Sequence, residues 1–114
     1  MPLLKIETNA RVDEERRPAL LKQLSEAVAA MLGKPESYVM VALESGRDML
    51  FAGDDAPLAL LQLKSLGLPE SRTGEYSSHL CRLMEEKLGI PPERVYIEFS
   101  APARHMWGWN GGTF

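Results

Sequence analysis

The sequence has little of what redox, metal and membrane proteins need. It contains one cysteine, Cys81, so an intramolecular disulfide and a CxxC redox pair are excluded. Two histidines, His79 and His105, are too few to indicate a metal cluster, and we expect none. No apolar run is long enough to cross a bilayer, and residues 1–5 lack the layout of a signal peptide. These absences favour a cytoplasmic protein with no membrane partner.

The charge is also unremarkable, which narrows the choice of partners. The chain has 114 residues and a formal net charge of −3, with acidic and basic residues interspersed. Binding to nucleic acid requires a basic face, so we expect no nucleic-acid partner. The length predicts a single domain, residues 1–114, and the 45% hydrophobic content is enough for one core.

The spacing of apolar residues predicts two helices and several strands. Leu4 and Ile6 alternate with charged residues, which is typical of a half-buried strand. Helical spacing recurs twice, and Gly33 and Gly89 are the expected ends of the two helices. The predicted elements are strands at 4–7, 38–43, 49–51, 58–66 and 95–99, with helices from near Pro18 to Leu32 and from Pro69 to Leu88.

An internal repeat organises these elements. Residues 32–41 align without gaps on residues 88–97, and each copy contains a helix end, a glycine, a proline turn and a strand. The pseudo-repeats cover about 1–56 and 57–114. For this reason we predict that 58–66 is a strand, although its Leu and Ala content favours a helix. The expected fold is α/β (α+β): two βαβ units that form a four-stranded mixed sheet with both helices on one face.

The second face of that sheet is expected to need a partner. Strands 38–43 and 58–66 are mostly apolar, and we expect them to be apolar on both faces. A monomer rarely exposes such a surface, so the pattern predicts oligomers with sheets facing a common axis. The aromatic, glycine-rich tail at 107–114 is expected to add an edge strand to a neighbour.

The N-terminal dipeptide Met1-Pro2 carries the chemical hypothesis. Removal of Met1 would leave Pro2 as a secondary amine, and an α-amino group titrates near pH 7.7–8.0. Burial and a nearby cation both lower that pKa, and a neutral amine is a general base. Two alternatives stay open at this point. Many chains begin Met-Pro without consequence, and if Met1 is retained the Pro2 nitrogen is an amide without basicity.

Several short motifs, in order along the whole chain, match one family. They are Met1-Pro2, Thr8-Asn9, Gly33-Lys34-Pro35, Tyr38, Ser65-Leu66-Gly67, Arg94-Val95-Tyr96-Ile97, Gly108-Trp109-Asn110 and Thr113-Phe114. The chain resembles the macrophage migration inhibitory factor and D-dopachrome tautomerase family, within the tautomerase superfamily. The resemblance implies a homotrimer around a central channel, with an active site at each subunit interface. It also implies cofactor-independent keto–enol tautomerisation of phenylpyruvate-like α-keto acids.

The resemblance also implies individual roles. Pro2 would be the catalytic base, Lys34 would meet the substrate carboxylate, and Tyr96 of a neighbouring subunit would hydrogen-bond the enolate oxygen. The other implied substrate contacts are a backbone contact at Leu66 and apolar walls at Tyr38, Trp109 and Phe114. Simpler structural roles remain open. Lys34 could only place a cation near a helix C-terminus, which is favourable by itself. Tyr38 and Tyr96 could be ordinary sheet residues, and Trp109 and Phe114 could only pack at an interface.

Departures from the family pattern define a second hypothesis. Glu98 stands where the macrophage factor carries Asn, and it would repel an anionic substrate or accept a hydrogen bond from a substrate hydroxyl. Trp107 replaces a small aliphatic residue beside the pocket. Leu58 and Leu61 replace the CxxC cysteines, which excludes thiol oxidoreductase chemistry through that motif. The alternative function is a cytokine-like binding trimer with a vestigial pocket, whose receptor surface one sequence does not reveal.

Overall fold

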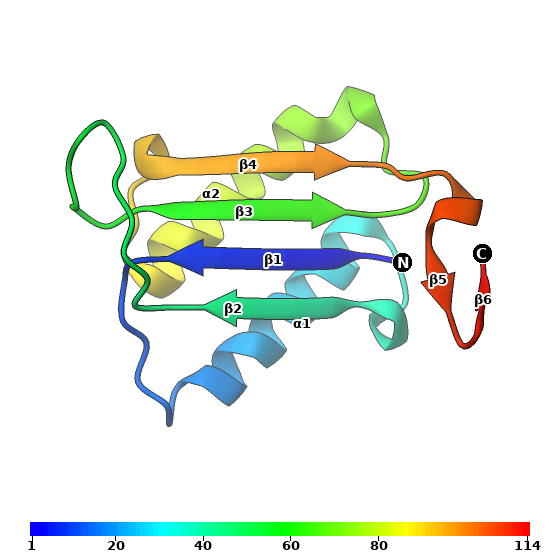
Figure 1. Ribbon diagram of the computed structural model, residues 1–114, viewed down its shortest axis with the longest axis horizontal. Helices are drawn as coiled ribbons and strands as arrows, with labels where there is room; N and C mark the ends of the chain where they lie inside the picture. Colours follow the sequence, from blue (N-terminus) through cyan, green and yellow to red (C-terminus); the bar gives the residue numbers. More distant parts are fainter.

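One four-stranded sheet with both helices packed on the same face forms the body of the molecule (Figure 1). The computed structural model describes residues 1–114. In chain order the elements are β1 (Leu3–Thr8), α1 (Arg17–Leu32), η1 (Glu36–Tyr38), β2 (Met40–Glu44), β3 (Ala59–Lys64), η2 (Glu70–Arg72), α2 (Thr73–Leu88), η3 (Pro92–Arg94), β4 (Val95–Ser100), η4 (Arg104–Met106), β5 (Gly108–Trp109) and β6 (Gly112–Thr113).

The topology confirms the predicted fold. The strand order is β2-β1-β3-β4, with β1 parallel to β2, β3 parallel to β4, and β1 antiparallel to β3. Each parallel pair is joined by a crossover helix, so the sheet is mixed. The two halves also agree in detail. Gly33 and Gly89 end their helices in the left-handed conformation, at φ 63° and 67°, and each is followed by a proline and a short 3₁₀ helix.

The core lies between the helices and the sheet. Inward side chains of β1 and β3 meet one stripe of each helix, as the periodicity predicts. Fully buried members include Leu4, Ile6, Leu24, Val28, Leu61, Leu63, Leu80 and Met84. No helix of the structure is both long enough and apolar enough to cross a membrane.

The open face of the sheet differs from the prediction. Side chains alternate along a strand, so Leu3, Lys5 and Glu7 share this face with their register partners. Polar residues occupy seven of the twelve positions: Lys5, Glu7, Glu44, Gln62, Lys64, Glu98 and Ser100. The expectation of apolar residues on both faces was therefore wrong for 58–66, where Gln62 and Lys64 lie on the open face. The strand residues of 38–43 are apolar on both faces, with Met40 and Ala42 on the open one. Two large exposed apolar side chains, Met40 and Tyr96, lie on this face. Tyr38, Leu50, Met106 and Trp109 are also exposed, outside the four strands.

Three predicted boundaries also need correction. Residues 49–51 form no strand, because Phe51 makes only a single bridge to Asp54 within a tight turn. Tyr38 lies in η1 rather than at the start of β2. The segment from Pro69 to Arg72 is a cap and a 3₁₀ turn, and the α-helix begins at Thr73. The tail forms its own antiparallel hairpin, β5–β6, and its pairing with a neighbour stays a prediction.

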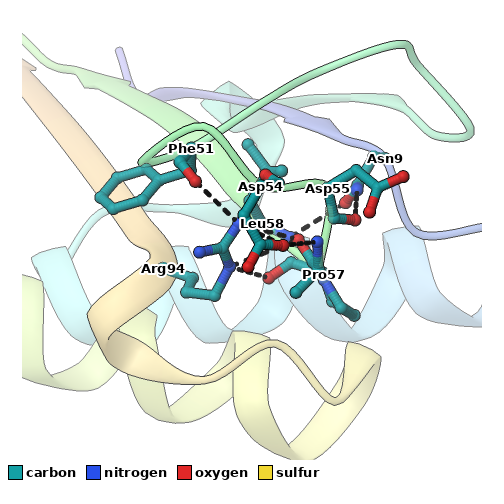
Figure 2. A network of polar contacts seen from close by, with 8 residues as sticks. Asn9, Phe51, Asp54, Asp55, Pro57, Leu58 and Arg94 are labelled. Carbon is teal, nitrogen blue, oxygen red and sulfur yellow. Dashed lines mark hydrogen bonds and ion pairs between the residues drawn. The ribbon is translucent and has the colours of Figure 1, made fainter.

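The end of β1 is bound to the loop that precedes β3. The Thr8 hydroxyl donates to the Leu58 carbonyl oxygen at 2.7 Å and accepts the Ala10 N–H at 3.0 Å. The Asn9 side chain donates to the Asp55 carbonyl at 2.8 Å and accepts the Leu58 N–H at 2.9 Å. Figure 2 shows Asn9 beside Asp55 and Leu58. Thr8 is fully buried, so these bonds satisfy polar groups that water does not reach.

Candidate active site

An apolar cavity lies where β1 begins, and residues of η1 and of the C-terminal hairpin line it. Figure 1 shows the N-terminus and the β5–β6 hairpin at the same end of the sheet. Its volume is about 270 Å³, at the lower edge of the range of small-molecule sites. Most of its lining is apolar, with few polar groups. The lining residues are Met1, Pro2, Leu3, Ser37, Tyr38, Val39, Met40, Trp107, Gly108, Trp109 and Phe114.

The parallel pairing of β1 with β2 brings the N-terminus to this cavity. Pro2 is buried, and its carbonyl oxygen accepts the Met40 N–H at 2.9 Å. Burial, together with the charges of Lys34 and, less strongly, Arg104, holds the pKa of the Met1 amine below its ordinary value of 8.0. With Met1 in place the Pro2 nitrogen is an amide, so the only amine at the cavity is that of Met1.

Three aromatic side chains form one wall of the cavity. The Tyr38 and Trp109 ring centroids lie 6.0 Å apart in an edge-to-face arrangement, and Trp109 stacks on Phe114 at 5.7 Å. The hairpin turn places Trp109, because Asn110 and Gly111 both have positive φ, as a type I′ turn requires. The Phe114 N–H donates to the Trp107 carbonyl at 3.2 Å, which closes the tail on itself.

Lys34 is placed by the end of α1. It follows the left-handed Gly33, and its N–H donates to the Ala29 carbonyl at 3.0 Å. The side chain does not line the cavity, yet its charge acts on the N-terminal amine. Arg104, in η4, also lowers the pKa of this amine, and no sequence motif predicted that role. Met40, missing from the predicted site, lines the cavity because it pairs with Leu3.

Three predicted residues do not reach this cavity within one chain. Tyr96 lies opposite Leu60, which in turn faces Glu7 at the far end of β1. Glu7 is five residue steps along the chain from Pro2, which corresponds to about 17 Å in a strand. Glu98 lies on the same open face and accepts a hydrogen bond from Gln62 at 3.1 Å. Leu66 is buried in the turn after β3 and does not line the cavity.

A second, wider depression lies at the opposite end of the sheet. It has a volume of about 700 Å³ and is lined mainly by polar loop residues, including Arg11, Arg47 and Asp48. Arg47 is already paired with Glu44. We place the candidate site in the smaller cavity because it combines an apolar lining with the amine whose pKa is lowered. No group of three or more His, Cys, Asp or Glu side chains is arranged to hold a metal ion.

The fold and this cavity together define a tautomerase-fold protein, with two βαβ units in one sheet and an N-terminal site. The family model described as "Macrophage migration inhibitory factor (MIF)" matches residues 1–114, and the chain belongs to that family. It is 39% identical to a macrophage migration inhibitory factor homolog of Trichuris trichiura, with 100% of each chain covered. It is 36% identical to macrophage migration inhibitory factor of Mus musculus, with 100% of this chain and 99% of that protein covered.

Solved structures agree with this assignment. The homologue from Prochlorococcus marinus has a TM-score of 0.91 and 42% sequence identity, with 98% of each chain covered. The factor from Trichinella spiralis has a TM-score of 0.89 and 34% identity, with 98% of this chain and 99% of that chain covered.

Proposed function

We propose that the chain is a cofactor-independent keto–enol tautomerase of phenylpyruvate-like α-keto acids, with the Pro2 amine as general base. The observation that carries the proposal is the N-terminal amine with a lowered pKa at an apolar cavity walled by aromatic rings. Removal of Met1 would move the amine to Pro2, which is more buried and lies at the same cavity. The causes that lower the pKa would then persist at the new position.

In the proposed reaction the neutral Pro2 nitrogen removes a proton from the carbon next to the keto group. The C–H electron pair forms the carbon–carbon double bond, and the carbonyl oxygen becomes the enolate oxygen. Lys34 would hold the substrate carboxylate, and Leu66 would contribute its backbone. The aryl ring would pack against Tyr38, Trp109 and Phe114. The enolate oxygen takes one proton from solvent to give the enol, and the protonated Pro2 amine returns one proton to solvent, so no net proton is gained or lost.

The enolate oxygen needs a hydrogen-bond donor, and we propose that Tyr96 of a neighbouring subunit supplies it. Within one chain Tyr96 lies at the wrong end of the sheet, yet its side chain is 66% exposed on the open face. A homotrimer with the open faces around a central channel would bring it to the next subunit's cavity. This assembly would also cover some of the large exposed apolar side chains, such as Met40.

The test uses protein whose intact mass shows that Met1 has been removed. We expect it to tautomerise phenylpyruvate, and Pro2→Ala to lower kcat/KM by about 10², because the primary amine that replaces the proline lacks the fixed ring geometry that places the general base. Pro69→Ala is a matched control, because Pro69 is exposed at the start of η2 and lies outside the cavity. Full activity in trimmed, folded Pro2→Ala protein would refute the proposal.

A binding trimer without turnover is the second candidate, and Glu98 favours it. Glu98 lies two residues from Tyr96 on the same face, so a subunit that lends Tyr96 would bring a carboxylate toward the anionic substrate. This reading expects no turnover by the trimmed wild-type protein, with activity appearing in Glu98→Gln. Wild-type turnover that Glu98→Gln leaves unchanged would contradict it.

A further inference from the structure

Arg94 organises the loop between β2 and β3. Its side chain is only 14% exposed and donates to the backbone carbonyls of that loop (Figure 2). Nε lies 3.3 Å and 3.1 Å from the Ala56 and Pro57 oxygens. Nη2 lies 3.2 Å, 3.0 Å and 3.1 Å from the oxygens of Phe51, Asp54 and Ala56. One buried cation thus holds a turn that has little regular structure of its own.

The same contacts fix the position of Phe51. Its N–H and carbonyl pair with the Asp54 backbone at 3.0 Å and 3.1 Å, and the Arg94 guanidinium lies 5.2 Å from the centre of its ring. The Phe51 ring also meets Tyr96 edge to face, with centroids 4.9 Å apart and planes at 65°. Phe51 therefore connects the loop that Arg94 holds to Tyr96.

Tyr96 needs such a contact because it is exposed. A tyrosine that is 66% exposed on an open sheet face samples several rotamers within nanoseconds. The Phe51 ring contacts the Tyr96 ring and therefore reduces the number of rotamers that Tyr96 can adopt. We propose that Phe51, held by Arg94, is a positioning residue that keeps Tyr96 in the orientation in which its hydroxyl meets a neighbouring site. The catalytic part of this inference rests on the proposed function.

A positioning role predicts a particular kinetic signature. A preorganised donor lowers the barrier without changing ground-state binding of the substrate. Loss of one aromatic pair should therefore reduce kcat by about three- to tenfold and leave KM nearly unchanged. Phe51→Leu is the test variant because it stays apolar, and Phe51→Tyr is the matched control because it keeps the ring.

The experiment compares Phe51→Leu in the wild-type and Tyr96→Phe backgrounds, using trimmed protein and phenylpyruvate. We expect Phe51→Leu to lower kcat in the first background and to have no further effect in the second, with Phe51→Tyr close to wild type. An equal loss in both backgrounds would overturn the inference, because Phe51 would then act through something other than the Tyr96 hydroxyl. No loss in either background would overturn it as well.

A second readout does not depend on turnover. The chain has three tyrosines, so 3-fluorotyrosine labelling gives three fluorine resonances, and Tyr96→Phe assigns the relevant one. We expect the Tyr96 resonance to relax as an ordered side chain in the wild type and as a mobile one in Phe51→Leu. Equal mobility in both would overturn the inference. If Pro2→Ala kept full activity, the proposed function would fail, and this relaxation alone would decide whether Phe51 orders Tyr96.

Discussion

Thr8→Val tests whether the buried hydroxyl at the end of β1 stabilises the fold. Valine has nearly the same shape as threonine, so the change removes hydrogen bonds and leaves the packing almost intact. The Leu58 carbonyl would lose its 2.7 Å donor, and the Ala10 N–H its 3.0 Å acceptor. Thr8 is 0% exposed and Leu58 is 3% exposed, so water does not replace the donor to the Leu58 carbonyl without a rearrangement, whereas Ala10 is only half-buried.

The magnitude follows from the two groups left without partners. The buried Leu58 carbonyl that loses its donor costs about 1–3 kcal/mol, and the part-buried Ala10 N–H adds about 1 kcal/mol, so Thr8→Val should lower the free energy of unfolding by about 2–4 kcal/mol. Thr8→Ser is the matched control, because it keeps the hydroxyl and removes one methyl group. It should cost only about 1 kcal/mol.

Urea unfolding followed by far-ultraviolet circular dichroism measures both variants. All samples need the same protein concentration, since any assembly of the folded chain adds to its apparent stability. The reasoning predicts that Thr8→Val is clearly less stable than Thr8→Ser. If Thr8→Ser were equally or more destabilised, the methyl group rather than the hydroxyl would be the stabilising part, and the hydrogen-bond argument would be refuted.

Two further predictions concern titrating groups. Lys34→Met should raise the pKa of the N-terminal amine, because the positive charge of Lys34 disfavours the protonated form of that amine. The rising limb of kcat/KM against pH should therefore move to higher pH. Arg104→Met should move the limb in the same direction by a smaller amount, since Arg104 is the weaker cause of the lowered pKa. An unmoved or lowered limb in Lys34→Met would contradict this. Burial raises the pKa of the Cys81 thiol against an opposing hydrogen bond with Ser77, so iodoacetamide should alkylate Cys81 more slowly than free glutathione at pH 7, and Ser77→Ala should slow it further. Alkylation as fast as that of glutathione would count against the buried thiol.

The fold was predictable where local patterns and long-range packing agree. The gap-free repeat at 32–41 and 88–97 predicts two parallel strand pairs, and it rightly overrode the helical propensity of residues 58–66. The pattern failed where a tertiary contact decides the structure. Met49-Leu50-Phe51 is apolar enough for a strand, yet Arg94 binds the carbonyls of Phe51 and Asp54 and holds the chain in a turn. No local sequence pattern predicts that contact.

The open face shows why composition alone misled. Leu58 to Leu66 is almost continuously apolar, but alternation sends Leu60, Gln62 and Lys64 to one side and Leu61 and Leu63 to the other. The face that this register exposes therefore carries both polar and apolar side chains. The apolar content of the strands alone does not reveal which residues lie on that face, so it is a weak basis for predicting assembly.

The candidate site was also predictable only where contacts within one chain decide the positions of its residues. Pro2, Tyr38, Trp109 and Phe114 meet in one chain because strand pairing and a type I′ hairpin, both readable from sequence, bring their backbones together. Tyr96 lies opposite Leu60, which pairs with Glu7 at the far end of β1, so no single-chain geometry brings Tyr96 to Pro2. If Tyr96 acts in catalysis, its partner is another copy of the chain, and the Phe51 contact matters because it orders Tyr96 before that copy binds. Catalysis would then depend on the loop at 51–57 in one subunit and on the N-terminal amine of the next.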